Sequence, residues 1–403
     1  MFRAAVIMNE WPRMPGFDNE LERIVTELNR AAPGGAPPGK SPAAAFGSSV
    51  APSGSSLEHL LAFAADRHAS DVILIADSPA ACRVHGNISA TGAPLSPEDI
   101  QDLLLPVFSP EHHRELQQKK SLDFSFVRPN GIRCRANIHY QRGTMAASIR
   151  ILPARVPTLE ALHLPLALAK FLDRRQGLVL VTGPTGCGKT TTLAALIDLL
   201  NKRNKFHIVT IEDPIEYQYT NALSVIEQIE VGRDTPDFVN SLRSLLRQNP
   251  DAILVGEMRD AETMATVLTA AETGHLVFST LHTNDTGQAI SRILDSFPAS
   301  NQTQIRQQLS MALTAIVAQQ LVPGPDGISR FPAVEVMAAT DAVRNLIRRG
   351  EDHQLRLQLS IGRADGMMTM EQSLAELVRS GRISRNTALA HCFRPEDLIN
   401  HMD

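Results

Sequence analysis

The sequence is poor in cysteine, and the cysteines it has are far apart. Its 403 residues include four, at Cys82, Cys134, Cys187 and Cys392. No two of them form a CxxC pair, so the spacing indicates neither a zinc site nor a disulfide framework. Free thiols of this kind fit a protein of the reducing cytoplasm.

Long apolar runs and aromatic residues are also scarce. No run reaches the roughly 18 residues that a membrane span needs. The first residues are interrupted by Asn9, Glu10 and two prolines, which makes a poor signal peptide. We therefore expect no direct membrane span, and any membrane association has to go through a partner. A net charge of −4 and 4% aromatic residues argue against a nucleic-acid partner.

The distribution of residue types along the chain predicts a leader and two domains. Residues 1–56 are expected to be a flexible leader and linker: 17–30 have the pattern of a short amphipathic helix, and 31–56 are rich in Ala, Gly, Pro and Ser. Residues 57–152 combine helical spacing with short strands, including a hairpin that turns at Arg142-Gly143, and predict a small α+β domain. Residues 158–403 predict an α/β domain with a helical C-terminal part.

The α/β prediction comes from four apolar runs that alternate with helical stretches. The runs are LVLVTG, HIVTIED, DAILVGE and HLVFSTLHT, a pattern typical of a parallel sheet covered by helices. Beyond Asp285 the chain is expected to be mostly helical, without another strand of this quality. Because ligands bind at the carboxyl ends of parallel strands, the polar residues that end these runs predict one shared site.

A glycine-rich loop follows the first of these runs and precedes a helical pattern. This is the strand, loop and helix of a P-loop nucleotide site, in which backbone N–H groups bind phosphates, the lysine reaches the β- and γ-phosphates and the threonine helps to hold Mg²⁺. A purely structural glycine turn is the alternative. The expected ATP-binding residues are Gly183, Pro184, Thr185, Gly186, Cys187, Gly188, Lys189, Thr190 and Thr191.

Carboxylates end two other runs. Glu257 ends DAILVGE, at the position where a P-loop enzyme serves Mg²⁺, so Thr190 and Glu257 are the expected metal ligands. Glu216 belongs to the acidic segment IEDPIE. Hydrolysis needs one carboxylate to orient and deprotonate water and another to serve the metal, and Glu216 and Glu257 can divide these tasks. The alternative is a solvated acidic turn and a surface glutamate.

Histidines and arginines complete the candidate site. His275 and His282 flank the fourth run, where they can sense the γ-phosphate or hydrogen-bond an acid; the alternative is that each is a satisfied core histidine. Four arginines crowd the expected hairpin of the first domain. Arginine stabilises charge on a transferring phosphoryl group, and these side chains would reach the P-loop of a neighbouring subunit in a ring, unless they form only a solvated face. They are Arg133, Arg135, Arg142 and Arg150.

With these residues in view, the chain from about Leu57 to Cys392 resembles the type IV pilus retraction ATPases, the PilT family of secretion motors. GPTGCGKT resembles the Walker A segment of that family, TIEDPIE its Asp box, DAILVGEMRD its Walker B segment and AAETGHLVFSTLHT its His box. AVRNLI at 342–347 resembles a C-terminal signature associated with retraction rather than assembly.

The resemblance implies a PAS-like N-terminal domain, a RecA-like ATPase domain and a homohexameric ring. It implies that Glu216 is the catalytic glutamate, Glu257 the Walker B acid, and His275 and His282 the His-box residues. Arg135 and Arg150 become the best candidates for fingers that act on ATP in an adjacent subunit. In three respects the chain departs from the pattern of the family. The segment ASDVILI lacks the family's early histidine, so no role is assigned to that position. Cys187 replaces the usual serine, which keeps the backbone N–H and adds a thiol open to oxidation. The leader has no counterpart.

The implied function is a Mg²⁺-dependent ATP-hydrolysing motor for pilus retraction and twitching motility. It would work in the cytoplasm at the inner face of the cytoplasmic membrane, docked on an inner-membrane platform protein and beside other pilus ATPases. The absence of a four-cysteine zinc module argues against an assembly or type II secretion ATPase. Three alternatives stay open: a related secretion or conjugative-pilus motor, a nucleic-acid translocase, and a regulatory nucleotide-binding subunit without turnover.

Overall fold

The computed structural model describes residues 56–84, 86–129, 131–153 and 155–402. The leader expected at 1–56, with its helix at 17–30, lies outside the described residues except for Ser56, which caps the first described helix by accepting from the backbone N–H of His59.

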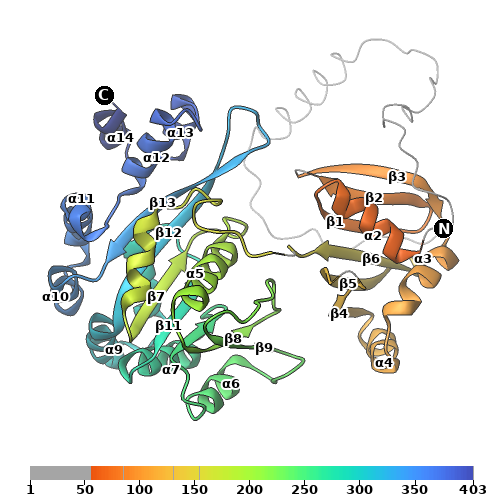
Figure 1. The fold of residues 1–403 in the computed structure, drawn as a ribbon, viewed down its shortest axis with the longest axis horizontal. Helices are drawn as coiled ribbons and strands as arrows, with labels where there is room; N and C mark the ends of the chain where they lie inside the picture. The colour runs from red at the N-terminus through yellow and green to blue at the C-terminus, as the bar shows by residue number, and fades with distance from the viewer. Residues whose placement is uncertain (1–55, 85, 130, 154, 403) are drawn as a thin grey trace, which may run out of the picture. The chain divides into compact units, whose positions relative to one another are not determined.

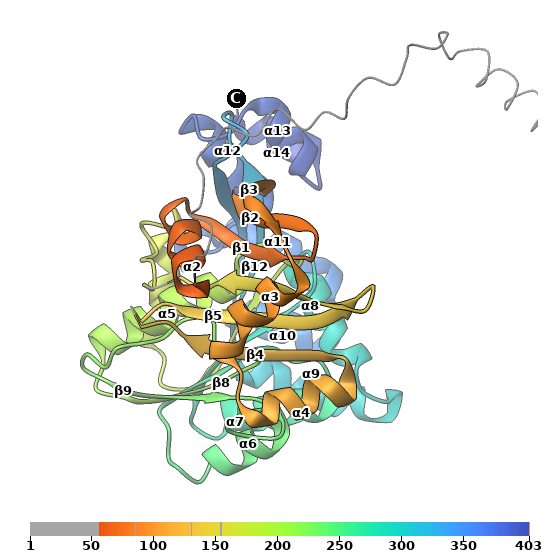
Figure 2. The ribbon, with the colours of Figure 1, turned by 90° about the vertical axis from the view of Figure 1, so that its right-hand side faces the viewer.

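Residues 57–151 form a six-stranded antiparallel sheet in the order β3-β2-β1-β6-β5-β4. In Figure 2 the labels β3, β2, β1, β5 and β4 follow this order from top to bottom. Helices α2, α3 and α4 contact β1, β6 and β4, respectively. The elements are α2 (Leu57–Asp66), β1 (Ala69–Leu74), β2 (Ser78–Val84), β3 (Asn87–Leu95), α3 (Pro97–Leu104), the 3-10 turn η1 (Leu105–Val107), α4 (Pro110–Lys119), β4 (Ser121–Val127), β5 (Arg133–Gln141) and β6 (Thr144–Ile151).

The hairpin expected in this region is confirmed. β5 and β6 pair from Cys134–Ile151 to Gln141–Thr144, and the two linking residues are Arg142 and Gly143. Their φ angles of 50° and 81° are both positive, as a two-residue hairpin turn of the type that matches strand twist requires.

A seven-stranded sheet organises the chain from Gly177 to Ala338, in the order β13-β12-β7-β11-β10-β8-β9. All neighbours are parallel except β12 and β13, which form a hairpin. This confirms the α/β expectation. The elements up to the hairpin are η2 (Leu166–Asp173), β7 (Gly177–Thr182), α5 (Lys189–Arg203), β8 (His207–Glu212), β9 (Val225–Glu230), α6 (Phe238–Leu245), β10 (Ala252–Val255), α7 (Ala261–Glu272), β11 (Leu276–Leu281), α8 (Thr286–Asp295), α9 (Ala299–Ala312), β12 (Leu313–Pro323) and β13 (Arg330–Ala338).

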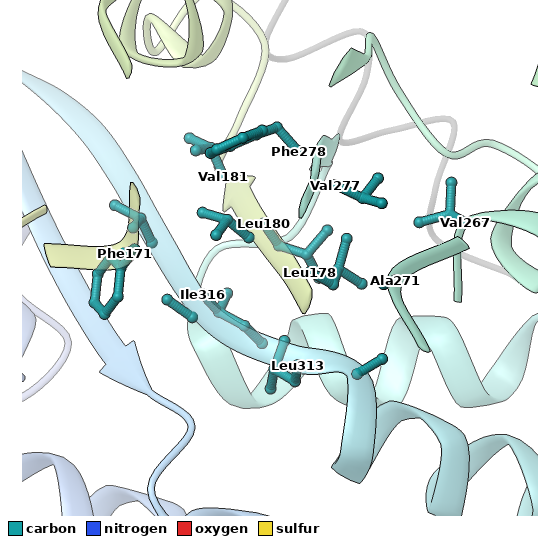
Figure 3. Packing of buried hydrophobic residues seen from close by; sticks show 14 of the residues in the cluster. Phe171, Leu178, Leu180, Val181, Val267, Ala271, Val277, Phe278, Leu313 and Ile316 are labelled. Carbon is teal, nitrogen blue, oxygen red and sulfur yellow. The ribbon is translucent and has the colours of Figure 1, made fainter. Parts of the chain in front are cut away.

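The central strands of this sheet are apolar on both faces because helices cover both sides. Every residue of β7, β10 and β11 is buried. Figure 3 shows Leu178, Leu180 and Val181 of β7 among side chains from β11, β12 and α7. Three of the helices begin at an aspartate, Asp237, Asp260 or Asp285, whose side chain accepts a backbone N–H of the first turn.

The expectation that the chain is mostly helical beyond Asp285, with no comparable strand, is wrong for β12 and β13. β12 is eleven residues long and lies between β7 and β13, with its first seven residues buried. Its sequence, LTAIVAQQLVP, contains Gln319 and Gln320 where a buried strand is expected to be apolar. Gln319 is nevertheless buried, because its amide has hydrogen-bond partners in the loop of the site described below.

Five helices follow β13 and are coloured blue in Figure 1. They are α10 (Asp341–Arg349), α11 (Leu355–Ile361), α12 (Met370–Arg379), α13 (Arg385–His391) and α14 (Pro395–Met402), with 3-10 turns η3 (Asp352–Gln354) and η4 (Gly362–Asp365). Helices α12 to α14 share a small apolar core with the ends of β12 and β13. Val343, Leu346 and Ile347 of the AVRNLI segment form the buried face of α10.

Candidate functional site

The glycine-rich loop joins β7 to α5 in a backbone shape that two of its glycines make possible. Gly183 has a φ of 147°, and a Cβ there would lie 2.2 Å from the carbonyl oxygen of Gln319. Gly188, the N-cap of α5, has a φ of 89°, and its Cβ would lie 3.0 Å from Nε2 of Gln319. Both residues have a positive φ that favours glycine, and a side chain at either position would press against Gln319, so the loop can follow this path only with glycine there. The loop ends at the start of α5, where N–H groups favour an anion.

Lys189 is buried at the first turn of α5. Its Nζ donates to the carbonyl oxygens of Gly183 (2.8 Å) and Pro184 (3.1 Å), and lies 3.4 Å from Nδ1 of His282. Burial lowers the pKa of this amine, and the nearby Glu257 acts in the opposite direction. The lysine is therefore held over the loop by the backbone that would surround a phosphate group.

His282 links this lysine to the acid at the end of β10. Its Nε2 lies 3.4 Å from a carboxylate oxygen of Glu257, which also forms an ion pair with Arg259. Since Nδ1 faces the donor Lys189 and Nε2 faces a carboxylate acceptor, these contacts favour the tautomer that carries its proton on Nε2. Lys189 begins α5, whereas His282 and Glu257 follow the neighbouring strands β11 and β10.

His275, the other expected histidine, does not join them within the chain. It directly precedes β11, whereas His282 follows it, so the two lie at opposite edges of the sheet. Its Nδ1 contacts the carbonyl oxygen of Ala270 at 3.0 Å, and its own carbonyl accepts from Gly177. The expectation that both histidines serve one pocket is corrected in this respect, because parallel strands place their beginnings and ends at opposite edges.

A cavity of about 710 Å³ lies at the carboxyl ends of the strands. This volume is in the range of sites for small ligands. Of the residues expected in the site, it is lined by Thr185, Gly186, Gly188, Lys189, Thr190, Thr191, Glu216, Glu257, His282 and Arg150. Glu212, Asp213 and Thr280 also line it. The structure thus brings together the loop, both acids and one histidine.

The arginines of the β5–β6 hairpin have different surroundings. Arg150 is largely exposed, and its Nε donates to Asp71 at 3.0 Å. Arg135 is exposed and lies 4.0 Å from Asp123, away from the cavity lining. Arg133 is buried in an ion pair with Glu230 of β9, whose carboxylate also accepts the N–H of Ile215. Arg133 is therefore a structural residue, because its guanidinium already forms a buried ion pair within the chain.

Cys187 does not fit the expectation of a thiol open to oxidation. The side chain is 3% exposed, and burial raises its pKa. The thiolate is the form that reacts with oxidants, so a buried protonated thiol is protected. Cysteine at this position leaves the backbone N–H groups of the loop unchanged.

Sequence reasoning missed Gln319, which holds the loop from the side of β12. Its Nε2 donates to the carbonyl oxygen of Cys187 at 2.6 Å, and its Oε1 accepts from the hydroxyl of Thr192 at 2.7 Å. The side chain is 3% exposed. One amide thus connects the loop to the helix that follows it. No local pattern signals this role, because Gln319 is far from the loop in the sequence.

Glu212 at the end of β8 is the most perturbed acid of the cavity wall. Burial raises its pKa to about 7, against hydrogen bonds from Thr210 (2.8 Å) and Gln228 (3.3 Å) that stabilise the charged form. A shift from the ordinary value of 4.5 corresponds to a cost of ionisation on the order of 3 kcal/mol. The folded state holds this proton more tightly than the unfolded state. Ionisation of Glu212 therefore does not lower the free energy of unfolding below pH 4.5, and it lowers it by the full amount above pH 7.

We therefore expect Glu212→Gln to stabilise the protein more at pH 8 than at pH 5. The glutamine keeps a carbonyl acceptor for Thr210 and Gln228 and has no charge to bury. Thermal unfolding of the variant and the parent at both pH values measures the effect. Glu262→Gln, at an exposed glutamate of α7 whose partner Arg243 stays charged at both pH values, is the control and should shift the midpoint equally at both. A Glu212→Gln effect that does not change with pH would contradict the assignment.

A parallel sheet with a glycine loop, a buried lysine and acids at its carboxyl edge defines a P-loop nucleotide-binding protein. Comparison with known proteins places the chain more narrowly. The family described as type II/IV secretion system protein matches residues 147–352, and the chain belongs to this family.

Individual relatives cover most of the chain. The twitching motility protein of Neisseria gonorrhoeae is 45% identical over 307 residues, which are 76% of this chain and 82% of that protein. The type IV pilus retraction ATPase PilT of Pseudomonas aeruginosa is 41% identical over 342 residues, 85% of this chain and 99% of that protein. A crystal structure of the pilus retraction motor PilT with bound ADP has a TM-score of 0.80 at 42% identity, covering 86% of this chain and 99% of that one.

These comparisons confirm the resemblance to the PilT family. A further observation bears on membrane association: within the described residues, no helix has both the length and the apolar character needed to cross a bilayer.

Proposed function

We propose that this chain is an ATP-hydrolysing motor that powers retraction of a type IV pilus and thereby twitching motility. The observation that carries the proposal is the single cavity that holds the glycine loop, Lys189, Glu216 and Glu257. The identity to proteins named for twitching motility and pilus retraction supports the cellular role. The AVRNLI segment, which lies within α10, supports retraction as the direction of force.

The residues fit a nucleotide and its magnesium ion. The glycines give the loop the positive φ angles that lead it into the start of α5, and Thr190 and Glu257, which line the cavity, offer the oxygen ligands that Mg²⁺ prefers. When bound, Mg²⁺ supplies charge neutralisation at the phosphates. Loop N–H groups and Lys189 orient the triphosphate, and Glu216 orients water and accepts its proton. His282 contacts Lys189 through Nδ1 and Glu257 through Nε2, and these contacts hold both side chains in place beside the loop.

The proposal includes a homohexameric ring in which arginines act between subunits. Arg135 is exposed on the first domain, away from the cavity lining, and is therefore available to a neighbour. Arg150 is exposed as well, but it lines the nucleotide cavity of its own chain and pairs with Asp71, so it would have to leave both to act on an adjacent subunit. An arginine that enters the adjacent site would stabilise the charge of the transferring phosphoryl group. The motor would work in the cytoplasm, at the inner face of the cytoplasmic membrane, docked on a platform protein of the pilus machine.

We expect ATP hydrolysis to be confined to the hexamer-sized fraction of the purified protein. Arg150→Ala and Arg135→Ala should lower the turnover of that fraction by about 10³-fold or more, the effect typical of a missing arginine finger, without changing its size. Arg114→Ala, an exposed arginine on α4 of the same domain, is the matched control. Full activity of a monomer, or of both finger variants, would rule out action between subunits.

The cellular role has its own test. A strain that lacks the gene is expected to assemble pili but to lose their retraction, measured as fibre shortening under the microscope. Complementation with the parent gene should restore retraction, and complementation with Lys189→Ala should not. A strain that still retracts its pili while the purified protein hydrolyses ATP would instead favour a secretion or conjugative-pilus motor. Stimulation of the ATPase by DNA would favour a translocase.

A further inference from the structure

A second cavity lies at the edge of the seven-stranded sheet opposite to the nucleotide cavity. It has a volume of about 590 Å³, and we call it the arginine cavity because Arg174, Arg175 and Arg344 line it. Gly177, the first residue of β7, and Thr314 of β12 form part of its wall. It shares no lining residue with the nucleotide cavity. Figure 3 shows Leu178, Leu313 and Ala271 close together at this end of the sheet.

Arg344, on α10, is held rigidly in this wall. Its Nε donates to the carbonyl oxygen of Ala339 at 2.9 Å, and its Nη1 donates to those of Ser310 (2.7 Å) and Met311 (2.5 Å) at the end of α9. These neutral acceptors fix the guanidinium without neutralising it. An arginine fixed in this way loses little side-chain entropy when it binds a ligand.

Positive charge in this cavity outweighs negative charge. Burial is the main cause that lowers the pKa of Arg344, and the positive charges of Arg174 and Arg348 lower it further. The carboxylate of Asp341 acts in the opposite direction. Among the described residues, no ion pair joins Arg174, Arg175 or Arg344 to a carboxylate. Glu272 is the one carboxylate in the lining, and its Oε2 accepts from Gln308 at 3.1 Å.

The close approach of β7 and β12 shapes the base of the cavity. A Cβ on Gly177 would lie 2.1 Å from Oγ1 of Thr314, so glycine alone fits there. From this point β7 runs to the phosphate loop and β12 runs to Gln319. The arginine cavity therefore lies at one end of the two strands whose other ends hold the nucleotide loop.

We propose that the arginine cavity binds a small anion that carries two or more phosphate groups. Like charges gathered in a partly enclosed space repel one another unless an anion lies between them. Guanidinium groups match phosphate oxygens in geometry and form charge-assisted hydrogen bonds with them. The volume suits a small molecule. This inference does not depend on ATP hydrolysis or on the pilus.

Titration calorimetry with inorganic pyrophosphate tests the proposal in a full-length Lys189→Ala variant, in which the glycine loop no longer competes. We expect one pyrophosphate per chain. Adding Arg174→Gln and Arg175→Gln should weaken binding by at least tenfold, because each removes a charge-assisted bond. Adding Arg114→Gln and Arg292→Gln instead is the matched control; these arginines are exposed on α4 and α8, outside the cavity lining, and their loss should leave binding unchanged.

Three results would overturn the proposal. One is no pyrophosphate binding to Lys189→Ala. Another is equal weakening by the cavity pair and the control pair, which would indicate a diffuse charge effect. The third is tighter binding of a short polyglutamate peptide, which would assign the cavity to an acidic protein segment. The pair Arg174→Lys and Arg175→Lys keeps the charge and should weaken binding less than the glutamine pair, so loss of folding is separated from loss of contacts.

Discussion

Glu216→Gln is expected to lower the turnover of ATP by about 10²- to 10⁴-fold while leaving nucleotide affinity nearly unchanged. A positioned carboxylate that accepts a proton from water contributes this much, and glutamine keeps the size of the side chain but cannot act as a base. Glu216 lines the same cavity as the loop that would hold the phosphates. Its removal should therefore affect the chemical step and spare binding.

Phosphate release and binding of a fluorescent ADP analogue, measured on the same preparation, separate the two effects. Glu227→Gln, an exposed glutamate of β9, is the control and should behave like the parent. Unaltered phosphate release by Glu216→Gln would exclude this residue as the base. If the parent also binds nucleotide without releasing phosphate, the chain would be a regulatory subunit and not a motor.

Gln319→Leu is expected to weaken ADP binding by about 10- to 100-fold, or about 1.4 to 3 kcal/mol. The substitution keeps a similar volume but leaves the carbonyl oxygen of Cys187 and the hydroxyl of Thr192 without their partner in a buried place. Each buried group without a partner costs about 1–3 kcal/mol, and the loop can avoid this cost only by moving away from the shape that suits a phosphate.

The adjacent Gln320 provides a matched control for this prediction. Its side chain donates to the carbonyl oxygen of His391 at 2.9 Å, away from the loop. Gln320→Leu should therefore lower stability without weakening ADP binding. If the two variants bind ADP equally well, Gln319 does not position the loop. Thermal unfolding of both, with and without ADP, distinguishes a loss of binding from a loss of folding.

The parts of the site that can be read from the sequence are those in which neighbouring residues act together. The loop from Gly183 to Thr191 needs a strand before it and a helix after it, and all three are contiguous. Glu257 and His282 end apolar runs that are recognisable as buried strands, and the shared carboxyl edge of a parallel sheet predicts that they meet. The hairpin turn at Arg142-Gly143 is equally local, because two positive φ angles depend on the two residues themselves.

Other features depend on contacts between distant segments, which no local pattern encodes. The sequence did not predict β12 because its two glutamines interrupt the apolar run. The hydrogen-bond partner of the Gln319 amide is the carbonyl oxygen of Cys187 in the loop, which lies far from it in the sequence. His275 and His282 bracket one strand, yet the extended backbone carries them to opposite edges of the sheet. Arg133 and Arg150 belong to one hairpin, but only Arg133 meets a buried acid, Glu230.

Local chemistry was thus enough to establish the α/β class, the nucleotide loop and the acids beside it, because backbone conformation and strand polarity follow from short stretches of chain. Three-dimensional packing was needed to show which arginines are paired with a buried carboxylate and which are exposed. It was also needed to show what holds the loop in place and why the thiol of Cys187 is protected from oxidants. Burial and hydrogen-bond partners set these properties, and both come from parts of the chain that meet only after it has folded.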